Sequence, residues 1–200
     1  MKLPESFYTS SNVVEIARNL IGKYLFTSLD GATTGGYIVE TEAYNGVIDK
    51  ASHAYGNRIT PRTQTMYAQG GVAYVYLCYG IHEMLNVVTS VEGQPHAVLI
   101  RAIQPTESID IMLYRRNMAV VKPNITKGPG SVGKALGITR KLNSISFQSN
   151  ELWIEDRGLV FSDNEVVAAP RIGVDYAGAD ALLPYRFYVK GNPYVSKPNH

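Results

Sequence analysis

The sequence is poor in the residue types that form disulfide frameworks, metal clusters and membrane anchors. Cys78 is the only cysteine among 200 residues, so no internal disulfide and no thiolate metal cluster can form. Because Cys78 stands in an apolar run, we predict a buried structural thiol and not a nucleophile. Residues 1–5 lack the apolar core of a signal peptide, and no stretch approaches the roughly 20 apolar residues of a membrane span. These absences predict a reducing, cytoplasmic location.

Charge is also scarce. Charged residues make up 18% of the chain and hydrophobic residues 45%, which is typical of a soluble globular protein. No repeat, low-complexity tract or linker divides the chain, so we expect one domain over residues 1–200. The net charge is only +2, yet residues 101–141 hold eight Lys or Arg residues against two acidic ones. That basic stripe would suit a polyanion partner, and it is equally typical of a solvated face.

Short segments that alternate between polar and apolar residues predict a fold dominated by strands. A helix is expected after Asn12, whose side chain can cap it with Glu15 three places on. Further helices are predicted over 106–116, after Pro105, and over 131–136. The predicted strands are 24–27, 36–44, 72–79, 84–91, 96–103, 152–155, 166–174 and 185–190. Because few regular crossover helices separate the strands, we predict an antiparallel α+β domain.

Two short motifs resemble nucleotide and zinc sites, but each lacks a required residue. Residues 128–135 nearly match a phosphate loop, yet Ala135 follows Lys134 where a magnesium-binding Ser or Thr is needed. Glycine-bared amides at that helix start could still hold one phosphate of a nucleic acid. Residues 82–86 resemble the start of a zinc-protease helix, but Asn86 occupies the place of the second histidine. We therefore expect neither triphosphate nor zinc binding.

Two carboxylates on one strand face and a tyrosine cluster are the stronger signals. Glu40 and Glu42 point to the same side of their strand, where one carboxylate could activate water. A solvated polar strand face would give the same pattern. Tyr74 and Tyr76 share a face of a later strand, and Tyr79 follows at a glycine turn. Aromatic faces stack nucleobases, and a cationic methylated base gains a cation–π term.

The segment 55–70 between these two strands is long and polar. It contains Arg58, Pro61 and Arg62. Long ordered loops inside a domain are often binding loops, although an ordinary mobile connection would have the same composition.

Ordered motifs occur through nearly the whole chain with the spacing of one family. In chain order they are Leu20-Ile21-Gly22, Val39-Glu40-Thr41-Glu42-Ala43-Tyr44, His53, Thr60-Pro61-Arg62, Tyr74-Val75-Tyr76, Tyr79-Gly80, Asn86, Leu99-Ile100-Arg101-Ala102, Arg171-Ile172-Gly173-Val174 and Phe187-Tyr188-Val189-Lys190-Gly191. With these motifs the chain resembles the 3-methyladenine DNA glycosylases of the mammalian alkyladenine type, which also occur in bacteria. It departs at Ile81, where methionine is frequent, and at Glu83-Met84, which replace a more usual aromatic or Cys pair.

The resemblance implies a single compact domain around a curved antiparallel sheet with flanking helices. It implies a monomeric enzyme that acts on damaged double-stranded DNA without metal or cofactor. The implied reaction is that of a DNA-3-methyladenine glycosylase in base excision repair: hydrolysis of the N-glycosidic bond of alkylated or deaminated purines after the nucleotide is flipped out of the stack. The substrates that the resemblance implies are 3-methyladenine, 7-methylguanine, hypoxanthine and ethenoadenine, which the sequence does not rank. The matched positions contain no lysine, which implies that the abasic site is left uncut.

The resemblance also assigns roles to individual residues. Glu42 matches the base that activates water against the sugar C1′. Tyr44, His53 and Tyr76 match the residues that contact the flipped base. Asn86 matches the amide that rejects the amino group of guanine.

Tyr79 matches the wedge that fills the gap left by the flipped base. The alternative is that Tyr79 is a core residue at a strand end. The resemblance extends to DNA contacts by Arg58, Thr60, Arg62, Ile81, His82 and Arg101.

Two other classes of function share these features. A non-catalytic nucleic-acid-binding module would use the tyrosines and the basic stripe without needing Glu42. A metal hydrolase would use Glu40 and Glu42 with His53 and His82. The separate roles of Glu40 and Glu42 also stay open at this point.

Overall fold

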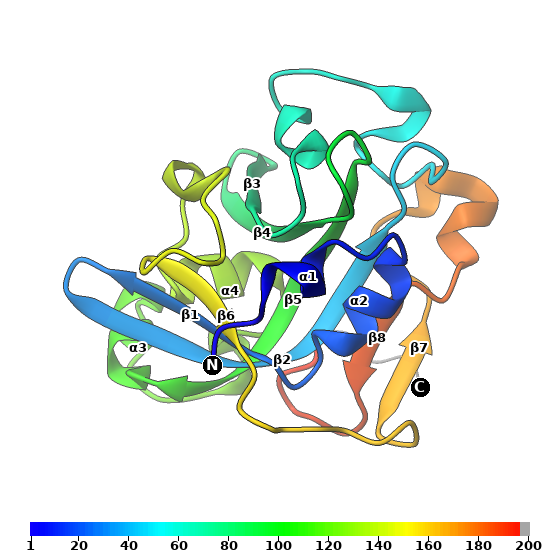
Figure 1. Cartoon of the computed structure of the whole chain (residues 1–200). Coiled ribbons are helices and arrows are strands. Elements are labelled where there is room, and N and C mark those ends of the chain that lie inside the picture. The colour runs from blue at the N-terminus through cyan, green and yellow to red at the C-terminus, as the bar shows by residue number, and fades with distance from the viewer. Residues whose placement is uncertain (197–200) are drawn as a thin grey trace.

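An open antiparallel sheet organises the protein, whose computed structural model describes residues 1–196. The sheet curves from β6 and β1 on one side to β4 and β3 on the other (Figure 1). Within the described residues its strands are β1 (Tyr24–Leu29), β2 (Ala32–Tyr44), β3 (Ala73–Cys78), β4 (His82–Thr89), β5 (His96–Glu107), β6 (Leu152–Glu155), β7 (Val166–Ala169) and β8 (Arg186–Val189). The order β3-β4-β5-β2-β1-β6, with β8 beside β2 and β7 beside β8, confirms the predicted antiparallel α+β fold.

Strand β2 is the longest strand and is shared by two neighbours on one edge. Its first half pairs with β1, and its second half, from Glu40 to Glu42, pairs with β8. The other edge pairs with β5, where the register shifts between Ile38 and Thr41. These shifts leave Arg101 as an extra residue on β5 between two paired positions. Bulges of this kind redirect a side chain, and here the affected residue is a predicted site residue.

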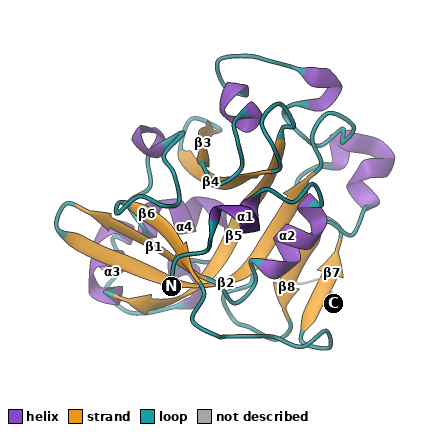
Figure 2. Ribbon diagram, viewed as in Figure 1, coloured by secondary structure: helices purple, strands orange, loops and turns teal. Residues whose placement is uncertain are grey.

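Helices cover both faces of the sheet (Figure 2). The α-helices are α1 (Glu5–Tyr8), α2 (Val13–Asn19), α3 (Ile109–Arg116) and α4 (Pro129–Ala135). Residues 1–196 also form five short 3-10 segments: η1 (Tyr55–Asn57), η2 (Gln64–Tyr67), η3 (Pro123–Ile125), η4 (Arg140–Leu142) and η5 (Asp175–Leu182). The predicted cap is confirmed, since the Asn12 side chain accepts the Glu15 amide at 3.1 Å. No helix in the described part of the chain is long and apolar enough to cross a membrane.

Two predicted features of the loops and helices need correction. The predicted helix start at 106 is wrong, because β5 continues to Glu107 and the helix begins at Ile109. The segment 55–70 is only partly an exposed loop: it contains η1 and η2, and Met66 is buried in a small cluster with Tyr74 and Val88. The loop is therefore anchored on the sheet beside β3.

Two of the three glycines of residues 128–135 are explained by close packing against β4. A Cβ atom on Gly130 would lie 2.7 Å from the ring of His82, and one on Gly133 would overlap the carbonyl oxygen of Glu83. Only glycine allows α4 this close to the strand. The glycine pattern is thus a packing feature.

Candidate active site

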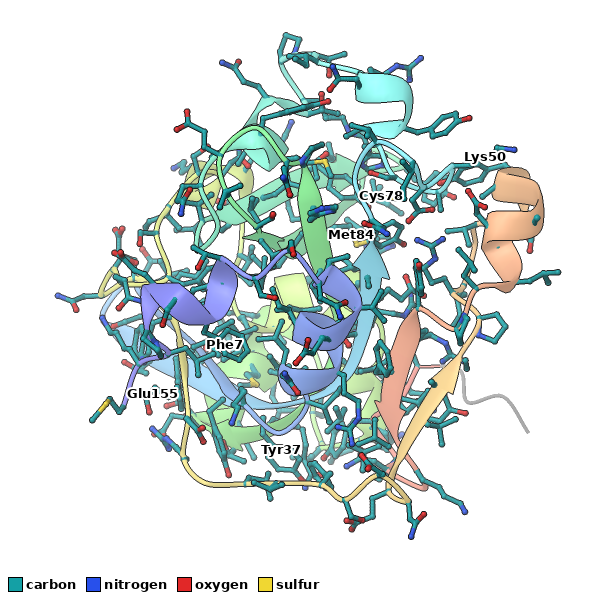
Figure 3. The ribbon with its side chains drawn as sticks, turned by 45° about the vertical axis from the view of Figure 1, so that its right-hand side comes forward. Phe7, Tyr37, Lys50, Cys78, Met84 and Glu155 are labelled. Carbon is teal, nitrogen blue, oxygen red and sulfur yellow. The ribbon has the colours of Figure 1, made fainter. Side chains whose placement is uncertain are left out.

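A pocket of about 520 Å³ lies between the end of β2, the β3–β4 hairpin and residues 172–176. This volume is within the usual range for ligand sites. Cys78 and Met84, labelled in Figure 3 below the loop of residues 55–70, both line it. Seven predicted site residues contribute to its walls: Tyr44, His53, Arg62, Tyr76, Tyr79, Asn86 and Arg101.

Strand β3 supplies an aromatic wall. Because side chains alternate along a strand, Tyr74 and Tyr76 emerge on the same face, with ring centroids 5.3 Å apart. His53 meets the Tyr76 ring edge-on at 4.7 Å. Asn86, which pairs with Tyr74 across the hairpin, donates its side-chain amide to the Tyr74 carbonyl at 3.1 Å. Tyr74, which was predicted to share a face with Tyr76 but was given no role of its own, therefore connects three predicted site residues.

The hydrogen bonds of His53 define its tautomer. Arg62 Nη2 lies 3.1 Å from His53 Nε2, and a guanidinium can only donate. Nε2 must therefore accept, and Nδ1 carries the proton that it donates to the Tyr74 hydroxyl at 3.0 Å. Burial, and then the Arg62 charge, lower the pKa of His53 to about 4. The imidazole is consequently neutral at pH 7.

The predicted DNA contacts are mostly exposed. Arg58, Arg62, Ile81 and His82 are exposed, and Thr60 is half-buried with its hydroxyl 3.2 Å from that of Thr63. The Arg62 guanidinium also lies 4.6 Å from the centre of the Tyr76 ring. Their contacts with DNA stay predictions.

Glu40 and Glu42 are both completely buried, so the alternative of a solvated strand face is wrong. A single guanidinium joins them: Arg101 Nε lies 3.0 Å from Glu40, and Arg101 Nη1 lies 3.2 Å from Glu42. Burial alone would lower the pKa of Arg101, but the two carboxylates outweigh this effect and raise it. Arg101, itself 7% exposed, therefore stays charged and is committed to internal ion pairs.

The structure separates the two carboxylates by their other partners. Glu40 accepts from Arg186 at 3.1 Å and from the amide and hydroxyl of Ser196 at 2.7 and 2.9 Å. Both of its oxygens are therefore occupied by groups of the protein framework. We conclude that Glu40 holds the sheet to the C-terminal segment.

Glu42 is bonded instead to groups that form the pocket wall. It accepts the Tyr44 hydroxyl at 2.9 Å and the Ile172 amide at 2.8 Å. Tyr44, Ile172 and Arg101 all line the pocket. Burial, and then Glu42, raise the pKa of Tyr44 well above its usual value, so the hydroxyl remains a donor. The carboxylate is thus fixed directly behind the wall.

Tyr79 stands at the mouth of the pocket on a tight turn. Both Tyr79 and Gly80 have positive φ, at 51° and 74°, and the Ile81 amide donates to the Cys78 carbonyl at 3.1 Å. A left-handed tyrosine is strained, and such strain is typical of functional positions. The side chain is 89% exposed, so the alternative of a core residue is wrong.

Sequence reasoning missed several residues around the pocket. Arg171 and Asp49 form a buried ion pair beside Tyr44. Tyr176 lines the pocket and donates its hydroxyl to the Ala51 carbonyl at 3.1 Å. The motif at 171–174 was a signal for this region, although it gave no role. The prediction of a buried Cys78 is wrong: it is half-buried, because β3 emerges from the core as it reaches the turn.

Comparison with known proteins agrees with this architecture. The family profile for methylpurine-DNA glycosylase (MPG) matches residues 6–193. A Chlamydia felis protein is 46% identical over 187 residues, which cover 92% of this chain and 94% of the relative. A Bacillus cereus (strain G9842) protein is 44% identical over 205 residues, covering 98% of this chain and the whole relative. Both relatives are provisionally named 3-methyladenine DNA glycosylases. The family inferred from the sequence motifs is confirmed, and the chain belongs to the methylpurine-DNA glycosylase family.

Proposed function

We propose that this DNA glycosylase removes alkylated or deaminated purines from duplex DNA by flipping the nucleotide and activating water with Glu42. The observation that carries the proposal is the position of Glu42, buried behind a pocket whose walls include Tyr44, His53 and Tyr76. Flat aromatic faces stack a base, and a fixed carboxylate accepts a proton. The substrate class is 3-methyladenine, 7-methylguanine, hypoxanthine and ethenoadenine.

In the proposed reaction the bond between C1′ and the purine nitrogen breaks and its electron pair leaves with the base. An N-methylated cationic base leaves as a neutral molecule, whereas a neutral base takes up one proton from solvent as it leaves. Water attacks C1′, where oxocarbenium character develops, and its proton passes to Glu42. The bonds from Tyr44, Ile172 and Arg101 keep the carboxylate ready to act as the acceptor.

Duplex specificity is proposed from Tyr79. A ring that is 89% exposed at the pocket mouth suits insertion into a base stack after flipping. Residues spread from Tyr44 to Tyr176 line this one pocket, which supports a single domain, and the proposed state is a monomer. No lysine occurs among these lining residues, which supports a glycosylase that leaves the abasic site uncut.

The proposal is tested with duplexes that each carry one lesion, incubated with the protein and then treated with hot alkali. Strand breaks are expected only after alkali. Glu42→Gln should abolish base release and keep DNA binding, because the amide retains the shape and loses the proton acceptor. Release by Glu42→Gln within tenfold of the parent would refute the role of Glu42.

A further inference from the structure

The buried guanidinium of Arg171 lies behind the pocket wall formed by Tyr44. Its carbon is 4.9 Å from the centre of the Tyr44 ring and 5.3 Å from that of Tyr185. Tyr44 lines the pocket and Arg171 does not. Because Arg171 contacts the ring without reaching the cavity, we infer that it lies against the face of Tyr44 turned away from the pocket.

Hydrogen bonds on the other side of the guanidinium hold it against the ring. Nη1 and Nη2 of Arg171 form a bidentate pair with Asp49, Nη1 donates to the Ala43 carbonyl at 2.9 Å, and Nη2 donates to the Asp180 carbonyl at 3.1 Å. The Nε–H is buried and has no hydrogen-bond acceptor in the described part of the chain. Stacking on the rings is what remains to stabilise that edge.

The same residue joins three segments that meet at the site. Its hydrogen bonds join the end of β2 to the loop of residues 45–51 and to η5. Asp180 of η5 also accepts the Lys50 amide at 2.8 Å. Figure 3 shows Lys50 beside this helical segment. The next residue, Ile172, donates to Glu42. Arg171 therefore fixes the stacking ring and the carboxylate relative to each other.

A cation on one face of an aromatic ring changes what the other face attracts. A cation is attracted by the negative charge above each ring face, and the guanidinium on one face pulls this electron density toward itself. The opposite face of Tyr44 consequently attracts a second cation less than a ring without this neighbour would. A neutral purine, held mainly by stacking and burial, loses less by the same effect.

We propose that Arg171 is a positioning residue that also determines specificity: through the back face of Tyr44 it shifts the pocket away from cationic N-methylated purines and toward neutral ones. The inference rests on the proposed function, since it requires a base stacked on Tyr44. It goes beyond that function because it assigns the balance between two chemical classes of lesion to one buried ion pair.

The test compares single-turnover release of 7-methylguanine, which is cationic, with release of hypoxanthine, which is neutral. The double variant Arg171→Met with Asp49→Asn removes both charges without leaving a buried charge unpaired. The ratio of 7-methylguanine to hypoxanthine release should rise about three- to tenfold, the size expected for one cation–π contact. Arg171→Lys is the matched control: it keeps the charge and loses the planar fork, so both rates should fall by a similar factor.

A second variant tests the inference even if the double variant fails to fold. In Tyr44→Leu the ring is lost, and release of both bases should fall with their ratio kept within about twofold, because Arg171 has already weakened the cation preference of that ring. A selective loss of 7-methylguanine release in Tyr44→Leu, or an unchanged ratio in the folded double variant, would overturn the inference and leave the proposed function intact. Failure of the parent protein to release either base would overturn both.

Discussion

Replacing Glu40 and Glu42 separately by glutamine should show that Glu40 contributes mainly to stability and Glu42 mainly to catalysis. Glu40 contacts two guanidinium groups, Arg101 at 3.0 Å and Arg186 at 3.1 Å, and both of its oxygens accept further bonds from Ser196. Among the described residues, Glu42 forms an ion pair with one guanidinium, that of Arg101, at 3.2 Å. Each substitution removes one negative charge from the same buried cluster, but the glutamine at position 40 faces two cations directly.

The magnitude follows from the cost of leaving a buried charge uncompensated. Breaking a buried ion pair from one side costs about 3–5 kcal/mol. For a domain of this size each kcal/mol lowers the melting temperature by roughly 2–4 °C. Glu40→Gln should therefore lower it by about 6–20 °C. Glu42→Gln should lower it by less than half of that, because the amide can still accept from Tyr44 or Ile172.

The assay pairs thermal unfolding with single-turnover release of hypoxanthine, measured well below both melting temperatures. Glu40→Gln should unfold early and still release the base, whereas Glu42→Gln should unfold near the parent temperature and release none. Equal losses of stability in the two variants would refute the division. So would loss of release by a Glu40→Gln protein that is still folded at the assay temperature.

Three further predictions concern the pocket rim. Tyr79→Ala should change the melting temperature by no more than about 2 °C, because Tyr79 is 89% exposed. It should slow base release from well-paired lesions more than from mispaired ones, and uniform slowing would exclude the wedge. Burial lowers the pKa of His53 to about 4, so between pH 6.5 and 4 the unfolded chain takes up a proton at His53 before the folded protein does, and stability should fall as pH falls. The fall, measured by urea unfolding, should be smaller for His53→Gln. Equal falls in the two proteins would contradict the lowered pKa of His53. Affinity for damaged duplex should fall steeply with salt, and Arg58→Gln should lower the log–log slope by about one; an unchanged slope would remove Arg58 from the phosphate contacts.

Features of the fold that depend on local pattern could be predicted from the sequence. The alternation at residues 73–78 places Tyr74 and Tyr76 on one face, and the structure confirms their contact. The helix cap at Asn12 is equally local and was also found. The end of β5 was not, because pairing of Glu107 and Pro105 with β2 overrides the helical pattern that begins there.

Features of the site that depend on distant segments could not be predicted. The Ser196 amide donates to Glu40, which lies 156 positions earlier in the sequence. Arg171 donates to Asp49, which lies 122 positions earlier. Neither contact leaves a periodic trace in the sequence. The bulge that leaves Arg101 as an extra residue on β5 likewise depends on the pairing of β2 with β5, and neither strand alone predicts it.

The buried charges behind the pocket suggest why these distant contacts converge there. Glu40 and Glu42 face Arg101 and Arg186, so this group of four is neutral before the reaction. If Glu42 accepts the proton of water as proposed, the group gains a net positive charge in a buried site, where that charge is unfavourable. The second arginine on Glu40 thus gives the two buried carboxylates two guanidinium partners, and the pairs join β2 to β5 and β8 directly behind the pocket.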